Sequence, residues 1–295
     1  MWIRGLCRQE KKWYDCFIIF IVNTYTNRGT IALRITALVE NHSSSDIKAT
    51  HGLALYIETG RHRLLFDVGP DDTLFENSKS LGIDLLDIDI VILSHGHSDH
   101  GGALESFLKL NHSAKVYAQR KAFERHYAKH FLRKRDVGVS INLQTHPQVV
   151  LLDGDHVIDD ELVLFTTPKT EKFRSTANNI LYSISGKDDF SHEQNLIILD
   201  RTNVLVMGCG HAGVINILEK AMEHDPKVCI GGYHLWNPLL KKTVSDKLLE
   251  GISQELSKYD ILFYTCHCTG QEAYNFFADR LKNMSYMFCG KTIEI

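Results

Sequence analysis

In the stretch Ser94-His95-Gly96-His97-Ser98-Asp99-His100, three imidazoles and one carboxylate fall within six consecutive positions. The almost wholly apolar run 87–93 comes directly before it and predicts a strand that is buried on both faces. Imidazole and carboxylate ligands together suit Zn, Fe or Mn rather than Ca or Mg. The stretch therefore predicts a transition-metal site at the end of a buried strand; the alternative is a surface loop of solvated histidines before a helix.

Three later strands are also predicted to end in a histidine. Residues 204–207 lead into Gly208-Cys209-Gly210-His211, 228–230 lead through two glycines to His234, and 261–264 lead into Cys266-His267-Cys268-Thr269-Gly270. The glycines before His211 let the backbone turn sharply after its strand. Catalytic loops commonly lie at such strand ends.

The pattern from residue 33 onward alternates β-branched runs with amphipathic helical stretches, which is typical of an α/β fold with helices outside the sheets. Runs 33–39, 53–58 and 62–66 predict an antiparallel meander, with Gly60-Arg61 as the turn between the last two. A basic helix is predicted over 120–130, and 195–199 with 204–207 predict a second hairpin. With no linker rich in Pro, Gly or Ser, we expect one domain over 33–295 and an N-terminal extension over 1–32.

The extension contains the apolar run 16–22, preceded by Lys11 and Lys12. The run is far shorter than the roughly 20 apolar residues that a membrane-spanning helix needs. No small-x-small cleavage site follows it, so a signal peptide is also not favoured. We predict no membrane attachment.

Composition favours a globular protein that acts on a small molecule. Of the 295 residues, 44% are hydrophobic and 23% charged, and the net charge of −3 provides no basic field for nucleic acid. The seven cysteines are odd in number and none are spaced C-x-x-C, which argues against a disulfide framework and predicts a cytoplasmic location. The 16 histidines raise the expectation of a metal site.

The H-x-H-x-D-H pattern after an apolar strand resembles the signature of the metallo-β-lactamase superfamily. Further stretches resemble one branch of it, the metal-dependent hydrolases named 7,8-dihydropterin-6-methyl-4-(β-D-ribofuranosyl)aminobenzene 5'-phosphate synthases. The resemblance runs from about residue 33 to the C-terminus and implies a four-layer αββα sandwich with its metals at one edge. The matching stretches are Leu38-Val39-Glu40-Asn41, His51-Gly52-Leu53-Ala54-Leu55, Leu65-Phe66-Asp67-Val68-Gly69, Gly208-Cys209-Gly210-His211-Ala212-Gly213, Gly231-Gly232-Tyr233-His234-Leu235 and His267-Cys268-Thr269-Gly270.

The resemblance also implies two divalent transition-metal ions, with Zn as the first expectation and Fe or Mn as alternatives. One ion is held by His95, His97 and a later histidine, and the other by Asp99, His100 and His267. For the later histidine we favour His211. Its rival is His192, which lies in a polar stretch where nothing local fixes its direction. Cys209 stands where many relatives carry a bridging Asp, so the ions are bridged by water alone or the second site is weak.

Other residues are assigned through the same resemblance. Asp99, His234 and His51 are the expected catalytic residues, although His234 and His51 each fit a merely supporting role as well. Asp67 is expected to orient a ligand histidine without binding metal. Cys209, Cys266 and Cys268 are candidate nucleophiles, but buried inert thiols are the commoner case. A loop of Lys169, Lys172 and Arg174 is a candidate phosphate grip or simply a solvated basic loop.

These observations predict a dinuclear metal-dependent hydrolase in which a metal-bound hydroxide attacks a small phosphorylated or heterocyclic, pterin-related substrate. Alternatives from other classes are a transferase like the synthase of the branch, a diiron oxidoreductase, a nuclease and a scaffold without activity. An oxidoreductase of this kind would need a flavin-binding partner domain, and a nuclease a basic groove, and the sequence provides neither. The intact metal motif argues against a scaffold.

Overall fold

The computed structural model describes residues 32–130, 133–168 and 172–295. The predicted extension 1–32, with its apolar run 16–22, therefore lies almost wholly outside the described residues. Within those ranges no helix is long and apolar enough to cross a membrane. The first strand begins at Arg34, close to the predicted start of the domain.

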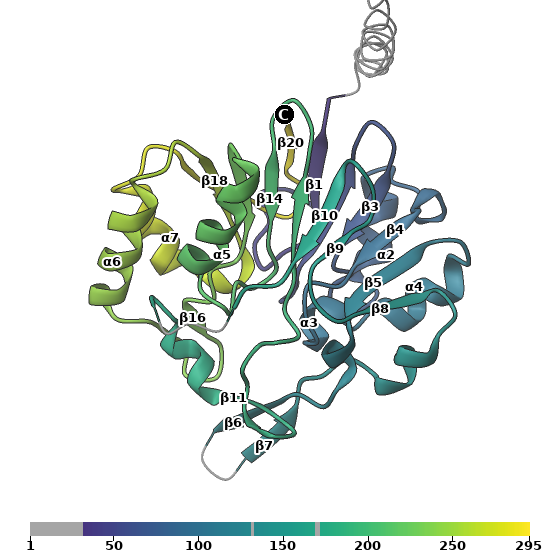
Figure 1. The fold of residues 1–295 in the computed structure, drawn as a ribbon, viewed down its shortest axis with the longest axis horizontal. Helices are drawn as coiled ribbons and strands as arrows, with labels where there is room; N and C mark the ends of the chain where they lie inside the picture. Colours follow the sequence, from purple (N-terminus) through teal and green to yellow (C-terminus); the bar gives the residue numbers. More distant parts are fainter. Residues whose placement is uncertain (1–31, 131–132, 169–171) are drawn as a thin grey trace, which may run out of the picture.

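One seven-stranded sheet comes from the first half of the chain together with the last strand (Figure 1). Its strand order is β20-β1-β2-β3-β4-β5-β8, antiparallel from β20 to β3 and parallel from β3 to β8. The predicted meander and the buried strand before the histidine cluster are both present. The strands are β1 (Arg34–Val39), β2 (Ala54–Glu58), β3 (Arg63–Phe66), β4 (Ile90–Ile92), β5 (Lys115–Gln119), β8 (Val149–Leu152) and β20 (Thr292–Glu294).

A second seven-stranded sheet comes from the other half of the chain. Its order is β19-β18-β15-β14-β13-β10-β9, with parallel pairing from β14 to β19. The predicted hairpin is the antiparallel pair of β13 and β14. The strands are β9 (His156–Val157), β10 (Leu162–Phe165), β13 (Asn195–Ile198), β14 (Val204–Val206), β15 (Val228–Gly231), β18 (Leu262–Thr265) and β19 (Met284–Tyr286).

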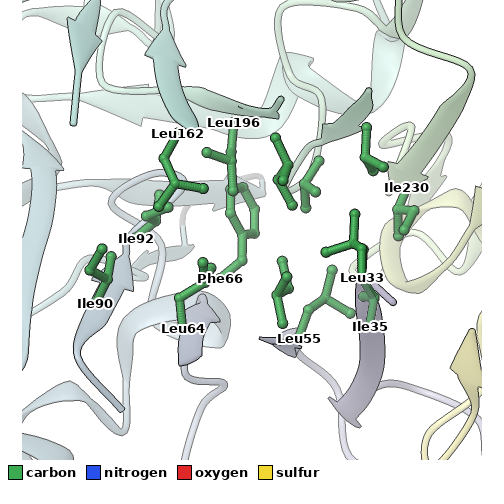
Figure 2. Packing of buried hydrophobic residues seen from close by; sticks show 14 of the residues in the cluster. Leu33, Ile35, Leu55, Leu64, Phe66, Ile90, Ile92, Leu162, Leu196 and Ile230 are labelled. Carbon is green, nitrogen blue, oxygen red and sulfur yellow. The ribbon is translucent and has the colours of Figure 1, made fainter. Parts of the chain in front are cut away.

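The main core lies between the two sheets. Figure 2 shows Leu55, Phe66 and Ile92 of the first sheet in one cluster with Leu196 and Ile230 of the second. Each fully buried side chain of this kind contributes about 1.5–3 kcal/mol relative to an exposed one. A short pair, β16 (Trp236–Asn237) with β17 (Lys242–Thr243), lies apart from both sheets.

Helices cover the outer face of each sheet, where two further apolar clusters lie. The first sheet is covered by α2 (Thr73–Ser80) and α4 (Leu104–Leu110), and the second by α5 (Val214–Ala221), α6 (Asp246–Leu256) and α7 (Gln271–Ala278) (Figure 1). The predicted four-layer αββα sandwich is therefore confirmed.

The helix predicted over 120–130 is wrong. A 3-10 turn, Arg120–Phe123, is followed by β6 (Tyr127–His130), which pairs with β7 (Arg133–Asp136) and β11 (Leu181–Ser183). With β12 (Gly186–Lys187) these strands form a small four-stranded sheet at one end of the sandwich. The backbone of β6 is satisfied by β7, which follows it directly, and by β11, which lies more than 50 residues later, and local helical propensity does not compete with that pairing.

Strand direction then places the polar loops. β4 leads into the H-x-H segment and helix α3 (Ser98–Gly101), while β14, β15 and β18 lead into the segments with His211, His234 and His267. The carboxyl ends of parallel strands meet at one edge of a sheet, which is where open α/β sheets bind their ligands. The four predicted strand-end histidines are thereby collected at one edge of the sandwich.

Candidate metal centre

The first donor set consists of His95, His97 and His211, all buried. Nε2 of His95 lies 3.0 Å from Nδ1 of His97 and 3.3 Å from Nε2 of His211. Burial and the neighbouring imidazoles lower the pKa of all three well below the usual value. Neutral rings with lone pairs this close to one another are the arrangement that ligands of one ion require.

The second donor set consists of Asp99, His100 and His267. Nε2 of His267 lies 3.2 Å from Nε2 of His100 and 3.3 Å from Oδ2 of Asp99. Burial would raise the pKa of the Asp99 carboxyl, but His100 and His267 hold it well below its usual value. The set therefore offers two imidazole nitrogens and an ionised carboxylate.

Asp67 fixes the direction of the imidazole rings from β3. Its carboxylate accepts hydrogen bonds from Nδ1 of His100 at 2.6 Å and from the backbone N and Oγ of Ser94, both at 2.7 Å. Since the Ser94 hydroxyl donates to Asp67, it is free to accept the proton of His95 Nδ1 at 2.8 Å. Nδ1 of both rings is thus held from outside, with Nε2 directed inward. Burial would lower the pKa of His100, but Asp67 and Asp99 raise it to about 9, so in the metal-free chain this ring is protonated and a metal ion would displace the proton from its Nε2.

Two asparagines orient the remaining pair of histidines in the same way. Nδ1 of His211 faces the amide oxygen of Asn178, and Nδ1 of His267 faces that of Asn41, each at 2.9 Å. The Nδ1 protons are held by these oxygens, so each Nε2 points inward as a lone pair. Metal-bound histidines typically donate the proton of their outer nitrogen to a carboxylate, hydroxyl or amide oxygen. The histidines of both donor sets therefore fit a pair of transition-metal ions.

Two buried carboxylates hold the backbone beside the later ligands, and sequence reasoning assigned no role to either. Glu40 accepts the backbone N–H of His267 at 2.6 Å, and Glu193 accepts those of His211 and Ala212 at 2.7 and 2.8 Å. Burial raises the pKa of Glu193 to about 7. Glu40 and Asn41 lie in a stretch that resembles the branch, which was the one available signal. For Glu193 and Asn178 no local pattern indicated this function.

The backbone is strained at three positions of the centre. Asp67, His234 and His267 have φ angles of 61°, 49° and 49°, in the left-handed region that non-glycine residues rarely adopt. Such conformations cost of order 1–3 kcal/mol each and persist where the surrounding structure enforces them. Three of the seven such residues in the described part of the chain thus lie at the centre.

Cys209 lies between the two donor sets. Its Sγ is 3.1 Å from Nε2 of His100 and also belongs to a compact group of donors with His267 and Cys268. Burial raises the pKa of the Cys209 thiol well above its usual value. The resemblance predicts that Cys209 stands where many relatives carry a bridging Asp. In the structure its sulfur lies beside both donor sets.

His192 stands outside both donor sets. Its Nδ1 accepts the backbone N–H of Gly96 at 3.0 Å, and its Nε2 faces Oδ1 of Asp188 at 3.3 Å. The expectation that nothing local fixes the direction of His192 is wrong, because Asp188 precedes it by four residues and the Gly96 amide meets its other side. The ring lies near the centre, but neither nitrogen is directed toward His211 or His95 as a free lone pair.

His51 and His234 flank the centre. Nε2 of His51 lies 3.5 Å from Oδ2 of Asp99, and its side chain is 47% exposed, so it stands at the mouth. The ring of His234 is 4.1 Å from that of His211, and its buried Nδ1 has no hydrogen-bond partner among the described residues. Both are therefore beside the donor sets, where a substrate would meet them.

The predicted basic loop is only partly described, because Lys169 lies outside the described residues. Lys172 forms an ion pair with Glu219. Arg174 donates to the backbone oxygen of Asp188 at 3.0 Å and packs over the ring of Phe190. The phosphate-binding role of these two side chains stays a prediction; Lys172 contacts α5, and Arg174 contacts the segment before His192.

Comparisons with known proteins agree with this geometry. Residues 47–171 match the model of the metallo-beta-lactamase superfamily. An uncharacterized protein of Methanocaldococcus jannaschii is 27% identical over 265 residues, covering 88% of this chain and 100% of the relative. From the same organism, the 7,8-dihydropterin-6-methyl-4-(beta-D-ribofuranosyl)-aminobenzene-5'-phosphate synthase is 26% identical, over 89% of this chain and 96% of the relative.

A solved structure described as a metal-dependent hydrolase of the beta-lactamase superfamily has 25% sequence identity and a TM-score of 0.75. The similarity covers 89% of this chain and 99% of that chain. The matched segment 47–171 contains the H-x-H-x-D-H motif, and the shared fold extends over both halves of the sandwich. The chain therefore resembles the metallo-β-lactamase superfamily over residues 47–171 and shares its fold with a metal-dependent hydrolase of that superfamily.

Proposed function

We propose that this protein is a dinuclear metal-dependent hydrolase that acts on a small phosphorylated or heterocyclic substrate. The observation that carries the proposal is the pair of adjacent donor sets, one of three imidazoles and one of two imidazoles and a carboxylate, whose lone pairs converge. His95, His97 and His211 would hold one ion, and Asp99, His100 and His267 the other. The chemistry that such ions supply when bound is Lewis acidity and a water of lowered pKa.

Two side chains of the chain itself are placed to contact the substrate. Burial and the neighbouring His267 lower the pKa of His51 to about 4, so at neutral pH its ring is uncharged and can accept a hydrogen bond at the mouth. His234 offers a buried Nδ1 that lacks a partner among the described residues, and a substrate atom would satisfy it. We assign both His51 and His234 contacts that orient the substrate.

A cavity lies next to the first donor set. It has a volume of about 390 Å³ and is lined in part by Lys121, Phe190 and Glu193. Phe190 stacks on His211 with ring centroids 4.4 Å apart and Glu193 binds the His211 backbone, but none of the six donor residues lines the cavity. Its volume is within the range of about 300–1,000 Å³ that is usual for small-molecule pockets, and Arg120 on its wall is paired with Asp153. We propose a small-molecule substrate rather than a nucleic acid, because the net charge of −3 provides no basic field.

A transferase is the second candidate, because the relative that is named a dihydropterin synthase matches 89% of this chain. The same donor sets would then bind the leaving group of a pterin substrate. The two candidates differ in the co-substrate: a hydrolase needs only water, whereas a transferase shows turnover only when an arylamine acceptor is present. An assay with and without the acceptor separates them.

Metal content tests the proposal directly. Protein purified without added metal is expected to contain about two transition-metal ions per chain, with Zn ahead of Fe or Mn, and His97→Ala and Asp99→Ala should each lower that number. His112→Ala is the matched control, since His112 is exposed in the loop between α4 and β5. A screen of phosphodiester, lactone and pterin substrates follows. Full activity in a chelator, from protein with none of these metals, would overturn the proposal.

A further inference from the structure

A third group of buried side chains lies behind the H-x-H segment. His97, His126, Asp188 and His192 each offer one donor atom, and these atoms lie within 4.8 Å of one another. His126 precedes β6, whereas Asp188 and His192 belong to the loop after β12, so three separate segments of the chain meet. Such a group is either a further metal site or a support for the H-x-H segment, and the positions of the ring protons decide between them.

The ring protons argue against a further metal site. Because the Gly96 N–H donates to Nδ1 of His192, the neutral ring carries its proton on Nε2, which faces Asp188. In His97 the Nδ1 atom belongs to the first donor set, so its proton is on Nε2 as well. A nitrogen that carries a proton has no lone pair for a metal. The Asp188 carboxylate is thus hydrogen-bonded to Nδ1 of His126 and faced by Nε2 of His192, while Nε2 of His97 and of His192 lack a regular hydrogen bond among the described residues.

Asp188 is the acceptor that joins this group. Its Oδ2 lies 3.0 Å from Nδ1 of His126 and its Oδ1 lies 3.3 Å from Nε2 of His192, while the Phe190 backbone N–H donates to Oδ1 at 2.8 Å. Burial alone would raise the pKa of the Asp188 carboxyl, but the contacts with His126 and His192 hold it far below its usual value. An ionised, buried carboxylate so placed fixes the ring plane of His192.

Gly96 is confined on its other side too. A Cβ atom on Gly96 would lie 2.2 Å from the Ala122 backbone oxygen and 2.8 Å from Nε2 of His126. The backbone between the two ligands is thus held between the 122–126 segment and the ring of His192. Any movement of this residue would change the 3.0 Å separation between the His95 and His97 nitrogens.

We propose that Asp188 and His192 are positioning residues for the first metal ion, which act by fixing the Gly96 amide and with it the spacing of His95 and His97. The carboxylate orients the imidazole, and the imidazole accepts the amide proton at the middle of the H-x-H segment. Neither residue binds the ion. The inference rests on the proposed metal centre. It adds that residues of the second half of the chain hold the H-x-H segment, which belongs to the first half.

The test compares two amide side chains at position 192. In His192→Asn the amide oxygen falls where Nδ1 of histidine was, so the acceptor for Gly96 is kept. In His192→Gln the amide lies one bond further out, near the former Nε2, and that acceptor is lost. Zn²⁺ affinity is measured by competition with a chromogenic chelator, the Co²⁺-substituted absorption spectrum reports ligand geometry, and thermal unfolding of the metal-free protein reports folding.

We expect the Zn²⁺ affinity of His192→Asn to stay within about threefold of wild type. In His192→Gln the affinity of the first site should fall by about tenfold or more, which is the usual effect of losing a group that orients a metal ligand. Both should still bind two ions at saturation. Asp188→Asn should resemble His192→Gln, and Asp189→Asn, whose carboxylate binds the nearby Ser191, should resemble wild type.

Two outcomes overturn the inference, and each differs from failure of the proposed function. Equal loss of one ion in His192→Asn and His192→Gln would make His192 a ligand. Wild-type affinity and Co²⁺ spectra in both variants would show that the Gly96 contact does not position the metal. Failure of the proposed function would instead appear as absence of metal binding in the wild-type chain.

Discussion

Sγ of Cys209 lies 3.1 Å from Nε2 of His100, at the midpoint of the candidate centre. A carboxylate at this position offers two oxygens to two ions, whereas a thiol offers one soft donor that favours Zn or Fe. Burial raises the pKa of Cys209, so in the metal-free protein the group is a protonated thiol and a poor nucleophile. The contact between Cys209 and His100 favours a role for Cys209 in the second metal site over attack on a substrate.

Cys209→Ser should therefore keep a large part of the turnover. A hydroxyl occupies nearly the same space and still contacts the centre, but it is a weaker donor for a soft ion. We expect activity within about tenfold of wild type at saturating metal, with a greater requirement for added Zn²⁺. Steady-state rates and metal content are the measurements. If Cys209→Ser is as inactive as His97→Ala while it keeps its metal, a cysteine-based hydrolysis replaces the mechanism proposed above.

His211→Ala should remove one ion and abolish turnover. Its Nε2 is one of three nitrogens in the first donor set and lies 3.3 Å from that of His95. Without it the first ion keeps only two protein ligands, fewer than the three usual for catalytic zinc. Metal analysis after dialysis should show about one ion fewer per chain, whereas His112→Ala should match wild type. Full occupancy in His211→Ala would assign the third ligand to another residue.

His62 provides a pH test remote from the metals. Nδ1 of His62 binds Asp89 at 2.6 Å and Nε2 binds Asp159 at 2.7 Å, which joins the two sheets. Burial would lower the pKa of His62, but these hydrogen bonds outweigh it and raise the pKa. The folded value then exceeds the unfolded value of about 6.5, so the stabilisation is complete below about pH 6.5 and is lost as the pH rises through the folded pKa.

His62→Ala should therefore lower the free energy of unfolding more at pH 5.5 than at pH 8.5. Partly exposed ion pairs are worth about 0.2–1 kcal/mol each, and that is the expected size of the difference. Urea unfolding of wild type and variant at both pH values measures it, with His112→Ala as the control. The same loss at both pH values would mean that His62 acts through packing and not through its charge.

Local sequence was sufficient for the motif and for most strands. His95, His97, Asp99 and His100 are separated by so few residues that one loop after a buried strand brings them together. Apolar runs such as 90–93 and 204–207 identify strands because burial on both faces requires an unbroken apolar pattern. The four-layer architecture then followed from the resemblance of the motif and the flanking stretches.

Local sequence failed where a partner far along the chain decided the outcome. The basic run 120–130 has helical character by itself, but the β6 backbone pairs with β7 and with β11, the latter more than 50 residues later. His192 appeared free of local constraint because the Gly96 amide that meets it lies 96 residues earlier in the chain.

The same distinction separates the ligands from the groups that orient them. The ligand histidines stand at strand ends in the sequence, where their chemistry is visible. Asn41 is 226 residues from His267, and Asn178 is 33 residues from His211, so no pattern of spacing links them. The packing of one sheet on the other brings Asn41 to His267, and the 3-10 turn Thr176–Ile180 brings Asn178 to His211. The sequence by itself therefore determined which groups are able to bind metal, and the tertiary structure decided which lone pairs face the centre, because a ring's direction is set by the hydrogen-bond partner on its outer side.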